Sequence, residues 1–241
     1  MPTLALIRHG QSQWNLENRF TGWMDVDLTP LGESQAQKSG RLLAQSDVVF
    51  GQAFTSLQTR AIRTLWLALQ AMNACWLPEQ KSWRLNERHY GALTGLDKAE
   101  TVAKHGETQV RIWRRSYDVL PPPQDVSDPY HPCHDVRYAN VPKEQLPNGE
   151  SLAMTLDRVL PYWQDVIAPC FANENVIISA HGNSLRAILK HLFGLNEAQI
   201  MDVEIPTGNP LLIELSSKLV PVAARYLDVE RAHPLPDLPR A

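Results

Sequence analysis

The sequence predicts an α/β fold in three layers, with helices on both faces of a mostly parallel central sheet. Short apolar runs, too brief for helices, alternate along the chain with longer segments in which apolar residues recur at helical spacing. The 241 residues are enough to bury a substantial core. A composition of 44% hydrophobic and 20% charged residues is that of a globular protein rather than a disordered one.

The N-terminal segment predicts a buried strand followed by a helix. Thr3–Ile7 is apolar, too short for a helix, and ends abruptly at Arg8. Thr29 suits the N-cap of the next helix and Pro30 suits its first position. We expect that helix to run to about Gln45.

A strand–helix unit comes next, and shorter elements follow it. Val48–Thr55 reads as a strand, and Ser56 can cap the helix after it. That helix carries an apolar stripe of Ala61, Ile62, Leu65 and Leu69. We expect a short third strand at Ser82–Leu85 and two helices, polar on one side, at Asp97–His105 and Glu107–Tyr117.

The C-terminal half repeats the alternation of strands and helices. A helix that begins at Ser151 carries the apolar stripe Leu152, Leu156, Val159, Trp163 and Ile167. Val176–Ala180 reads as a buried strand, and a helix at Leu185–Leu192 follows it. Late strands are expected at Leu211–Leu215 and Val220–Tyr226.

Two segments lack any sustained period. Residues 120–147 are rich in proline and read as an excursion of one domain, because neither flank looks complete alone. Residues 227–241 also contain several prolines and read as a loose tail. Long loops of this kind often act as lids, so both segments are candidates for closing a site. We therefore expect a single domain over residues 1–241.

Two strand ends carry the residues best suited to chemistry. Arg8-His9-Gly10 follows the first strand, and His181-Gly182-Asn183 follows a later strand and opens a helix. Ligands of parallel sheets bind beyond the carboxyl ends of the strands. Neutral histidine is a nucleophile near pH 7, arginine binds phosphate oxygens, and a helix N-terminus binds anions. If the two strands are neighbours, the two histidines form a site for phosphoryl transfer.

Phosphoryl transfer also needs positive charge and a group that moves a proton. Arg8, Arg60 and a protonated His181 can supply the charge without a metal, and Ser56 lies at the same turn as Arg60. Glu87, in the run Glu87-Arg88-His89-Tyr90-Gly91, is the candidate for moving the proton on the oxygen that gains or loses the phosphoryl group.

Further cations and polar groups suit a second charged group on the substrate. Lys98, Arg114 and Arg115 can bind a carboxylate or a second phosphate remote from the reacting phosphorus. Asn15, Thr21 and Gly22 can add neutral hydrogen bonds.

Several classes of function are disfavoured by composition. His131-Pro132-Cys133-His134 holds three potential metal ligands, but no second cluster at zinc-like spacing completes a site. The three cysteines are widely spaced, which argues against a disulfide framework and fits the cytosol. No apolar run approaches the ~20 residues of a membrane span. A net charge of -3 argues against nucleic-acid binding.

Together these residues resemble the 2,3-bisphosphoglycerate-dependent phosphoglycerate mutases of the histidine phosphatase superfamily. The resemblance spans roughly Thr3 to Tyr226, and its matching stretches include LALIRHGQSQWNLENRFTGWMDVDLTPLGESQA, FTSLQTRAIRT, LNERHYGALTGLDKAET, IWRRSYD, GESLAMTLDRVLPYW, IISAHGNSLRAILKHL and IPTGNPLLIEL. Arg-His-Gly marks only the superfamily, whereas ERHYG, the paired arginines and IPTG mark the mutase branch.

The resemblance implies a phosphoglycerate mutase-like fold and a role for each matching residue. His9 would carry the phosphoryl group, His181 would stabilise the transition state, and Glu87 would donate and accept the proton. Arg8 and Arg60 would bind the phosphate and complete the catalytic set. The implied substrate-binding positions are Gly10, Gln11, Ser12, Asn15, Thr21, Gly22, Arg88, His89, Tyr90, Lys98, Arg114, Arg115, Gly182 and Asn183.

The resemblance also implies a reaction and its partners. Members interconvert 2-phosphoglycerate and 3-phosphoglycerate in glycolysis and gluconeogenesis, are primed by 2,3-bisphosphoglycerate and use no metal. The implied partners are small-molecule phosphoglycerates, with further copies of the chain in a homodimer or homotetramer. The implied location is the cytoplasm, with neither nucleic acid nor membrane as a partner.

Three positions depart from the family pattern. Asp97 stands beside Lys98 where asparagine is common, and it either weakens anion binding or faces solvent. Gly149 stands where threonine is common. The tail after Tyr226 is short and has no lysine, which bears on the balance between mutase and phosphatase activity.

Two other functions fit parts of the pattern. A phosphatase would use His9 on another phosphate ester, and the density of substrate-side cations disfavours it. A non-catalytic protein that binds phosphorylated metabolites would not need the full catalytic set, and every member of that set is present.

Overall fold

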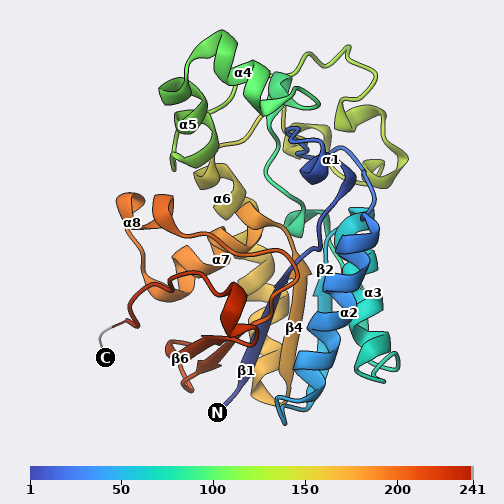
Figure 1. The fold of residues 1–241 in the computed structure, drawn as a ribbon, viewed down its shortest axis with the longest axis vertical. Coiled ribbons are helices and arrows are strands. Elements are labelled where there is room, and N and C mark those ends of the chain that lie inside the picture. Colours follow the sequence, from blue (N-terminus) through green and yellow to red (C-terminus); the bar gives the residue numbers. More distant parts are fainter. Residues whose placement is uncertain (240–241) are drawn as a thin grey trace.

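A six-stranded sheet runs through residues 1–239, the part of the chain that the computed structural model describes (Figure 1). Its order is β3-β2-β4-β1-β5-β6. The strands are β1 (Thr3–Arg8), β2 (Phe50–Thr55), β3 (Glu79–Lys81), β4 (Asn175–Ala180), β5 (Leu211–Leu215) and β6 (Pro221–Tyr226). Neighbours from β3 to β1 pair in parallel, and β5 pairs antiparallel with both β1 and β6. The predicted α/β class with a mostly parallel sheet is confirmed.

Helices cover both faces of the sheet, because alternate residues of each buried strand face opposite layers. In β1, Leu4 and Leu6 join the core on the side of α6 (Leu152–Tyr162) and α7 (Gly182–Phe193). Ala5 and Ile7 join the core on the side of α2 (Pro30–Ala44) and α3 (Thr59–Ala71). Figure 1 shows β1 and β4 between these two helix pairs.

The start of α2 agrees with its sequence signals, whereas the start of α3 does not. Thr29 caps α2 by accepting a hydrogen bond from the Gly32 N–H at 3.1 Å. Ser56 was expected to cap α3, but that helix begins at Thr59. The Ser56 hydroxyl instead accepts a bond from the Gln58 N–H at 3.1 Å, in the turn before the helix.

The third strand lies just before its predicted position. We expected it at Ser82–Leu85, but β3 ends at Lys81 and Trp83–Leu85 forms a 3₁₀ turn. The Ser82 hydroxyl accepts from the Arg84 N–H at 3.2 Å and so caps that turn. This local hydrogen bond competes with extended structure.

Smaller elements stand above the carboxyl ends of the central strands (Figure 1). They are α1 (Gln13–Leu16), α4 (Lys98–His105), α5 (Glu107–Arg115) and the proline-rich residues 120–147, which contain three 3₁₀ turns. The helix α8 (Glu197–Asp202) follows α7 and was not predicted. The stripe predicted from Ser151 onward is largely buried and continues past α6 through a π-helical turn at Trp163–Ile167.

The first residues after β6 are tied to the body of the fold. The Asp228 carboxylate, only 6% exposed, accepts bonds from Lys38 Nζ of α2 and from Arg231 Nε, both at 2.6 Å. Arg231 also donates to the carbonyls of Thr207 and Gly208. This part of the expected loose tail is therefore anchored. Among the described residues, no helix combines the length and apolar character needed to cross a bilayer.

Candidate active site

The two histidines expected at neighbouring strand ends lie next to each other. β1 and β4 pair in parallel with Arg8 opposite Ala180, so the next residue on each strand is a histidine. The His9 N–H donates to the Ala180 carbonyl at 2.9 Å, and the rings of His9 and His181 have centroids 5.0 Å apart. The sheet therefore brings together groups that are far apart in the sequence.

His9 is buried in an orientation that suits a nucleophile. Its Nδ1 lies 2.7 Å from the Gly10 carbonyl oxygen, which can only accept, so Nδ1 carries the proton. The lone pair is then on Nε2. Burial, followed by the charges of Arg60 and Arg8, lowers the pKa of His9 well below its usual value. The imidazole is thus neutral and able to attack at pH 7.

The surroundings of His181 also disfavour its protonated form. Burial, then the charge of Arg60 and the neighbouring His9, lowers the pKa of His181 well below its usual value. Its Nε2 lies 2.8 Å from the Ser56 hydroxyl, and its backbone N–H donates to Ser184 at 3.2 Å. In the substrate-free protein the positive charge of the site therefore comes from arginines.

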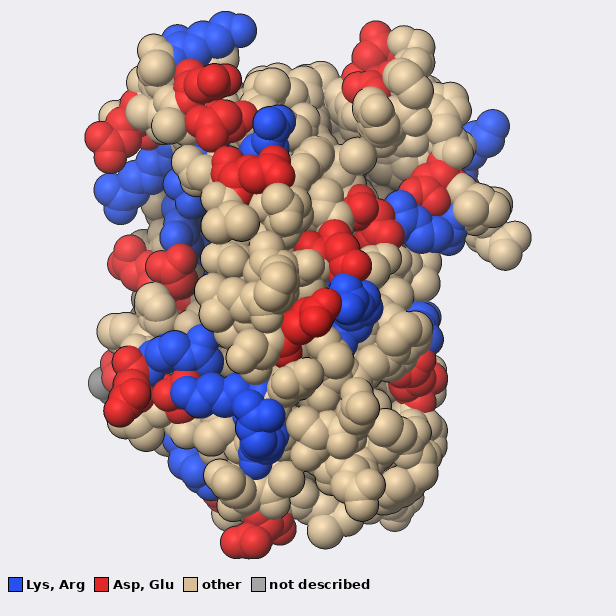
Figure 2. All heavy atoms as spheres, turned by 45° about the vertical axis from the view of Figure 1, so that its right-hand side comes forward, with Lys and Arg blue, Asp and Glu red and all other residues tan. Residues whose placement is uncertain are grey.

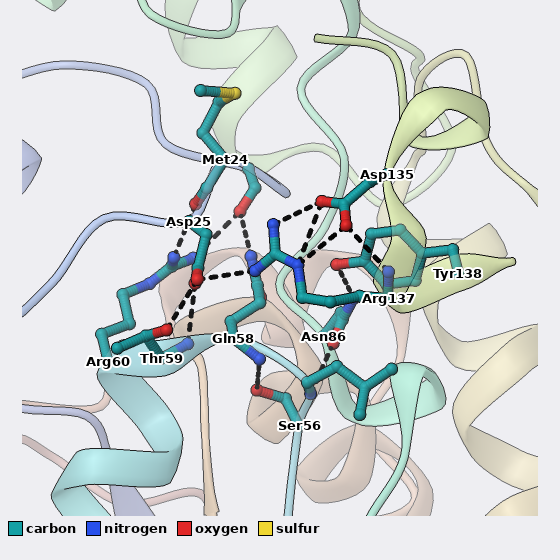
Figure 3. Close-up of polar contacts among 12 residues, drawn as sticks. Met24, Asp25, Ser56, Gln58, Thr59, Arg60, Asn86, Asp135, Arg137 and Tyr138 are labelled. Atoms are coloured by element: carbon teal, nitrogen blue, oxygen red, sulfur yellow. Dashed lines mark hydrogen bonds and ion pairs between the residues drawn. The ribbon is translucent and has the colours of Figure 1, made fainter.

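Arg60 is fully buried and is held by backbone carbonyls rather than by a carboxylate. Its Nη1 donates to the Met24 carbonyl and its Nη2 to the Gly22 carbonyl, both at 2.9 Å (Figure 3). Burial lowers its pKa to about 10, so the guanidinium stays charged at neutral pH. Arg8 is held in the same way, through Nη1 to the Ile205 carbonyl at 2.7 Å.

Several buried nitrogens of this region lack a hydrogen-bond partner within residues 1–239. They are Nε of Arg8, Arg60 and Arg186, Nε and Nη1 of Arg88, and Nδ1 of His181. Buried polar groups are normally paired, so unpaired donors of this kind indicate a place for a ligand. Since four of the residues are arginines, that ligand is an anion, and a phosphorylated metabolite fits.

Glu87 is held at the N-terminus of α7, close to the cations. Its Oε1 accepts from the N–H of Asn183 at 3.0 Å and from the N–H of Arg88 at 2.8 Å. A Cβ added at Gly182 would lie 3.6 Å from Arg8 Nε and 3.7 Å from Glu87 Oε2. The missing side chain at Gly182 thus leaves open the space between the arginine and the carboxylate.

The backbone around Glu87 is fixed by a buried ion pair that sequence reasoning missed. Arg158 Nε lies 2.6 Å from Glu150 Oε1, with side chains 7% and 3% exposed. Arg158 Nη2 donates to the Glu87 carbonyl at 2.9 Å, and Glu150 Oε2 accepts from the His89 N–H at 2.7 Å. Trp23 Nε1 donates to the same Glu87 carbonyl at 2.6 Å. The only signal in the sequence is an acid and a base eight residues apart at the start of a helix.

On the substrate side, α7 is linked to the ERHYG loop. Asn183 Nδ2 donates to the Tyr90 hydroxyl at 3.2 Å, and its Oδ1 accepts from Arg186 at 2.9 Å. Arg186 is 3% exposed and also donates to the Ile200 carbonyl. Nothing in the sequence distinguished Arg186 from a surface cation of α7.

The predicted outer cations lie on α4 and α5, and the charges of Arg114 and Arg8 both act on Lys98. Lys98 Nζ is 5.8 Å from the Phe20 ring centroid. Burial lowers the pKa of Lys98, and this effect outweighs that of the nearby Tyr90, which raises it. Arg115 pairs with Glu204 at 3.2 Å. Cavities of about 520 and 450 Å³ lie here, the first lined by Arg114 and Arg115 and the second by Arg8 and the anchored tail.

Other predicted substrate-binding residues have their side chains or backbone engaged in supporting the site. Gly10 lets the strand end approach α2, and Gln11 bonds to Thr29. Ser12 and Asn15 cap α1 reciprocally.

The ring of buried His89 accepts from the Gly91 N–H at 3.0 Å, and Arg88 donates to the carbonyls of Trp113 and Arg114. Thr21 is buried, and the Gly22 carbonyl accepts from Gln58 and Arg60.

Asp97, one of the positions that depart from the family pattern, has a structural role. The Asp97 carboxylate caps α4 by accepting from the N–H groups of Ala99 and Glu100 at 2.7 and 2.9 Å. A Cβ added at Gly149 would lie 3.5 Å from both Gly91 and Pro121, an ordinary contact, and nothing in the structure explains the glycine there. His131 and His134 bond to Asn148 and the Val126 carbonyl. Among residues 1–239, no group of three or more His, Cys, Asp or Glu side chains is placed to hold a metal ion.

Surface charge is mixed on the side of α2 and α3. Figure 2 shows basic and acidic side chains lying next to one another on this face. The ion pairs of Arg63 with Asp27 and Glu33 belong to this interleaved pattern.

Comparison with known proteins identifies the family. The profile of the histidine phosphatase superfamily (branch 1) matches residues 4–128 and 123–219. Relatives named 2,3-bisphosphoglycerate-dependent phosphoglycerate mutase include one from Hyphomonas neptunium, 62% identical over 99% of this chain and 100% of its own. Another, from Maricaulis maris, is 59% identical over 100% of both chains.

Solved structures share the fold at lower identity. A mycobacterial glucosyl-3-phosphoglycerate phosphatase superposes with a TM-score of 0.71 at 22% identity, covering 95% of this chain and 98% of its own. Bacillus stearothermophilus YhfR gives 0.68 at 22% identity, over 90% and 93%. The full-length identity to the mutases decides the branch: this chain belongs to the 2,3-bisphosphoglycerate-dependent phosphoglycerate mutase family of the histidine phosphatase superfamily.

Proposed function

We propose that the protein interconverts 2-phosphoglycerate and 3-phosphoglycerate by way of a phosphoryl group carried on His9. The observation that carries this proposal is that Arg8 and Arg60, each with an unpaired buried Nε, lie near a neutral His9 whose Nε2 is free. None of Arg8, Arg60, Arg88 and Arg186 is in an ion pair with a carboxylate within the described residues, so their charge remains for a phosphorylated ligand.

The first half of the reaction moves a phosphoryl group from His9 to the substrate. The substrate hydroxyl oxygen attacks the phosphorus, the bond from phosphorus to His9 Nε2 breaks, and Glu87 takes the hydroxyl proton. Arg8 and Arg60 stabilise the charge on the three equatorial oxygens. His181, neutral before substrate binds, gains basicity beside a phosphate and can then donate to it.

The second half is the reverse transfer from the other oxygen of the bound bisphosphate. His9 Nε2 attacks the second phosphorus, the bond to the carbon-linked oxygen breaks, and Glu87 returns the proton to that oxygen. The intermediate must turn without leaving and without meeting water. Lys98, Arg114 and Arg115 suit that retention, and 2,3-bisphosphoglycerate supplies the phosphoryl group that first loads His9.

The setting of this activity follows from its substrates. Phosphoglycerates are small cytoplasmic metabolites, and we therefore infer that the protein works in the cytoplasm. We also infer a homodimer or homotetramer. Two tryptophans near the sheet-edge strand β3 support this inference, because Trp66 is 52% exposed and Trp76 is 70% exposed.

Phosphorus NMR distinguishes this function from its rivals. The protein is mixed with 3-phosphoglycerate and a trace of 2,3-bisphosphoglycerate. We expect 2-phosphoglycerate to accumulate to equilibrium with little inorganic phosphate. Dominant inorganic phosphate would identify a phosphatase that uses the same histidine, and ligand binding without turnover would identify a non-catalytic protein.

Two substitutions assign the roles within the site. His9→Ala should abolish turnover. Glu87→Gln keeps an acceptor for the two N–H groups but cannot take a proton, and should lower kcat by about 10²- to 10⁴-fold. A His9→Ala protein that still turned over would contradict the proposal.

A further inference from the structure

Two neighbouring residues of the proline-rich segment reach both halves of the site. Arg137 and Tyr138 belong to the 3₁₀ turn Val136–Tyr138. Figure 3 shows Arg137 directed at Asp25, on the side of Arg60, and Tyr138 directed at Asn86, the residue before Glu87. The two directions lead to two separate chains of contacts.

The first chain ends at the phosphate-binding Arg60. Arg137 Nη1 lies 2.7 Å from the Asp25 carboxylate, with side chains 30% and 24% exposed. Asp25 also accepts from the N–H of Thr59 at 2.7 Å and from its hydroxyl at 2.6 Å. These bonds satisfy the first turn of α3, which carries Arg60. Residue 24, next to Asp25, supplies the carbonyl that binds Arg60 Nη1.

The second chain ends at Glu87 and at His181. Tyr138 is 2% exposed, and its hydroxyl accepts from Asn86 Nδ2 at 2.9 Å. Asn86 precedes Glu87, and its Oδ1 accepts from the Leu57 N–H at 3.0 Å. Leu57 follows Ser56, whose hydroxyl is 2.8 Å from His181 Nε2. The Tyr138 ring also packs 4.8 Å, centroid to centroid, from Trp23, which donates to the Glu87 carbonyl.

The segment is also attached to the body of the protein at several other points. The Pro122 carbonyl accepts from the Ala92 N–H at 2.8 Å, directly beyond the ERHYG loop. The Gln124 N–H donates to the Asn148 carbonyl at 2.7 Å, which closes the two ends of the segment on each other. Gln124 and His131 are 7% and 3% exposed, and Pro132 is buried. These anchor points would have to break before the segment could open as a lid.

We propose that Arg137 and Tyr138 are positioning residues, which hold the Arg60 guanidinium and the Glu87 carboxylate at a fixed separation. The proline-rich residues 120–147 are then a permanent wall of the site rather than its lid. This inference rests on the proposed phosphoryl transfer through His9.

Each positioning residue should affect a different constant. Arg137→Gln loosens Asp25 and the loop that binds Arg60, so inhibition by orthovanadate, a mimic of the transferring phosphoryl group, should weaken by about tenfold. Arg137→Lys keeps the charge and should recover part of the loss. Tyr138→Phe removes only the hydroxyl, and should lower kcat by about tenfold with KM nearly unchanged, because Glu87 then sits less well for proton transfer.

Matched controls lie on the same segment. Tyr130→Phe makes the same change on a ring that is 70% exposed, and Lys143→Gln removes an exposed cation. Both should match the wild type. Wild-type constants in Arg137→Gln and Tyr138→Phe would overturn the proposal, as would equal losses of kcat and vanadate affinity in all four variants.

Hydrogen exchange tests the wall without any variant. Amides of residues 131–141 should have the same protection in the free wild-type protein and after addition of orthovanadate. A gain of protection on binding would show a lid that closes and would overturn the proposal. Neither vanadate binding nor exchange requires mutase turnover, so a wild type that proved to be a phosphatase would refute the proposed function and leave this test intact.

Discussion

At the scale of single residues, the site is built from arginines that are held by the backbone. Arg60, Arg88 and Arg186 are each buried and donate to main-chain carbonyls. A carbonyl fixes a guanidinium without cancelling its charge, whereas a carboxylate would do both. The site therefore keeps its attraction for a phosphorylated substrate while its cations stay in place.

Arg158 is different, because its charge is paired with Glu150 and serves to hold Glu87. Glu150→Gln leaves that buried guanidinium without its partner and should lower the free energy of unfolding by roughly 3 kcal/mol. It should also lower kcat, since the Glu87 carbonyl loses a well-placed donor. Urea denaturation and steady-state kinetics measure the two effects.

A double substitution separates stability from positioning. Glu150→Gln combined with Arg158→Met removes the uncompensated charge and should regain much of the stability, but not kcat. Recovery of both would show that the pair acts on stability alone. Glu144→Gln changes an exposed carboxylate just before this site and is the matched control.

The sequence predicted the candidate reacting residues but not the protonation states of the two histidines. His9, His181, Glu87, Arg8 and Arg60 were predicted, and the fold places them together. The Nδ1–H form of His9 depends on a carbonyl whose direction is set by the backbone after β1. The neutrality of His181 depends on burial that only the assembled fold supplies.

At the scale of elements, two glycines that follow strands differ in whether the fold has room for a side chain. A Cβ at Gly10 would lie 2.2 Å from the Gly32 carbonyl oxygen of α2. Gly10→Ala should therefore force the helix away and cost about 3 kcal/mol. A Cβ at Gly182 meets only ordinary contacts, so Gly182→Ala should fold with an unchanged or slightly higher Tm.

Although Gly182→Ala should fold, it should lose most of its activity. The methyl group of Gly182→Ala would occupy the space between Arg8 and Glu87, where phosphate oxygens are expected. We expect a folded protein with little turnover and weak vanadate inhibition, measured beside its melting curve. Full activity in Gly182→Ala would mean that the substrate lies elsewhere.

Element boundaries were predictable where local signals agreed with the fold. Thr29 and Pro30 marked the start of α2, and the apolar run of β4 marked a buried strand. β3 was misplaced because Ser82 caps a 3₁₀ turn, and a short edge strand of Glu79–Lys81 carries no apolar pattern. Ser56 does not cap α3, because its hydroxyl accepts from the Gln58 N–H before the helix begins and contacts His181, which is distant in the sequence.

At the scale of the whole molecule, buried neutral histidines make stability depend on pH. Burial lowers the pKa of His89 to about 4, and also lowers those of His9 and His181. Above the unfolded value of about 6.5, both states are neutral and stability is full. As the pH falls below it, the unfolded chain binds protons first, so stability falls, by up to about 3 kcal/mol for His89 alone.

Urea denaturation at about pH 7.5 and about pH 5 measures this loss. His89→Asn keeps an acceptor for the Gly91 N–H and removes the titrating group, so its stability should change less between the two conditions. His105→Asn alters a histidine at the exposed end of α4 and should behave as the wild type. An equal loss in the His89 variant would contradict the assignment.

The layered architecture was predictable, and its long-range contacts were not. Short apolar runs that alternate with segments of helical spacing indicate helices on both faces of a parallel sheet, whatever the order of the strands. The docking of residues 120–147 involves Arg137 and Tyr138 among other contacts, and both lie in a segment without any period. Only the folded chain shows that this segment lines the site.

The central place of β1 also bears on how the protein is made. Both neighbours of β1 in the sheet, β4 and β5, come from residues 175–215. A ribosome therefore releases His9 early and β4, the strand that pairs beside it, late. Until then β1 is an apolar strand with two open edges, a form that aggregates readily and is a natural client for chaperones. Enzymatic activity during synthesis would thus report the emergence of nearly the whole chain.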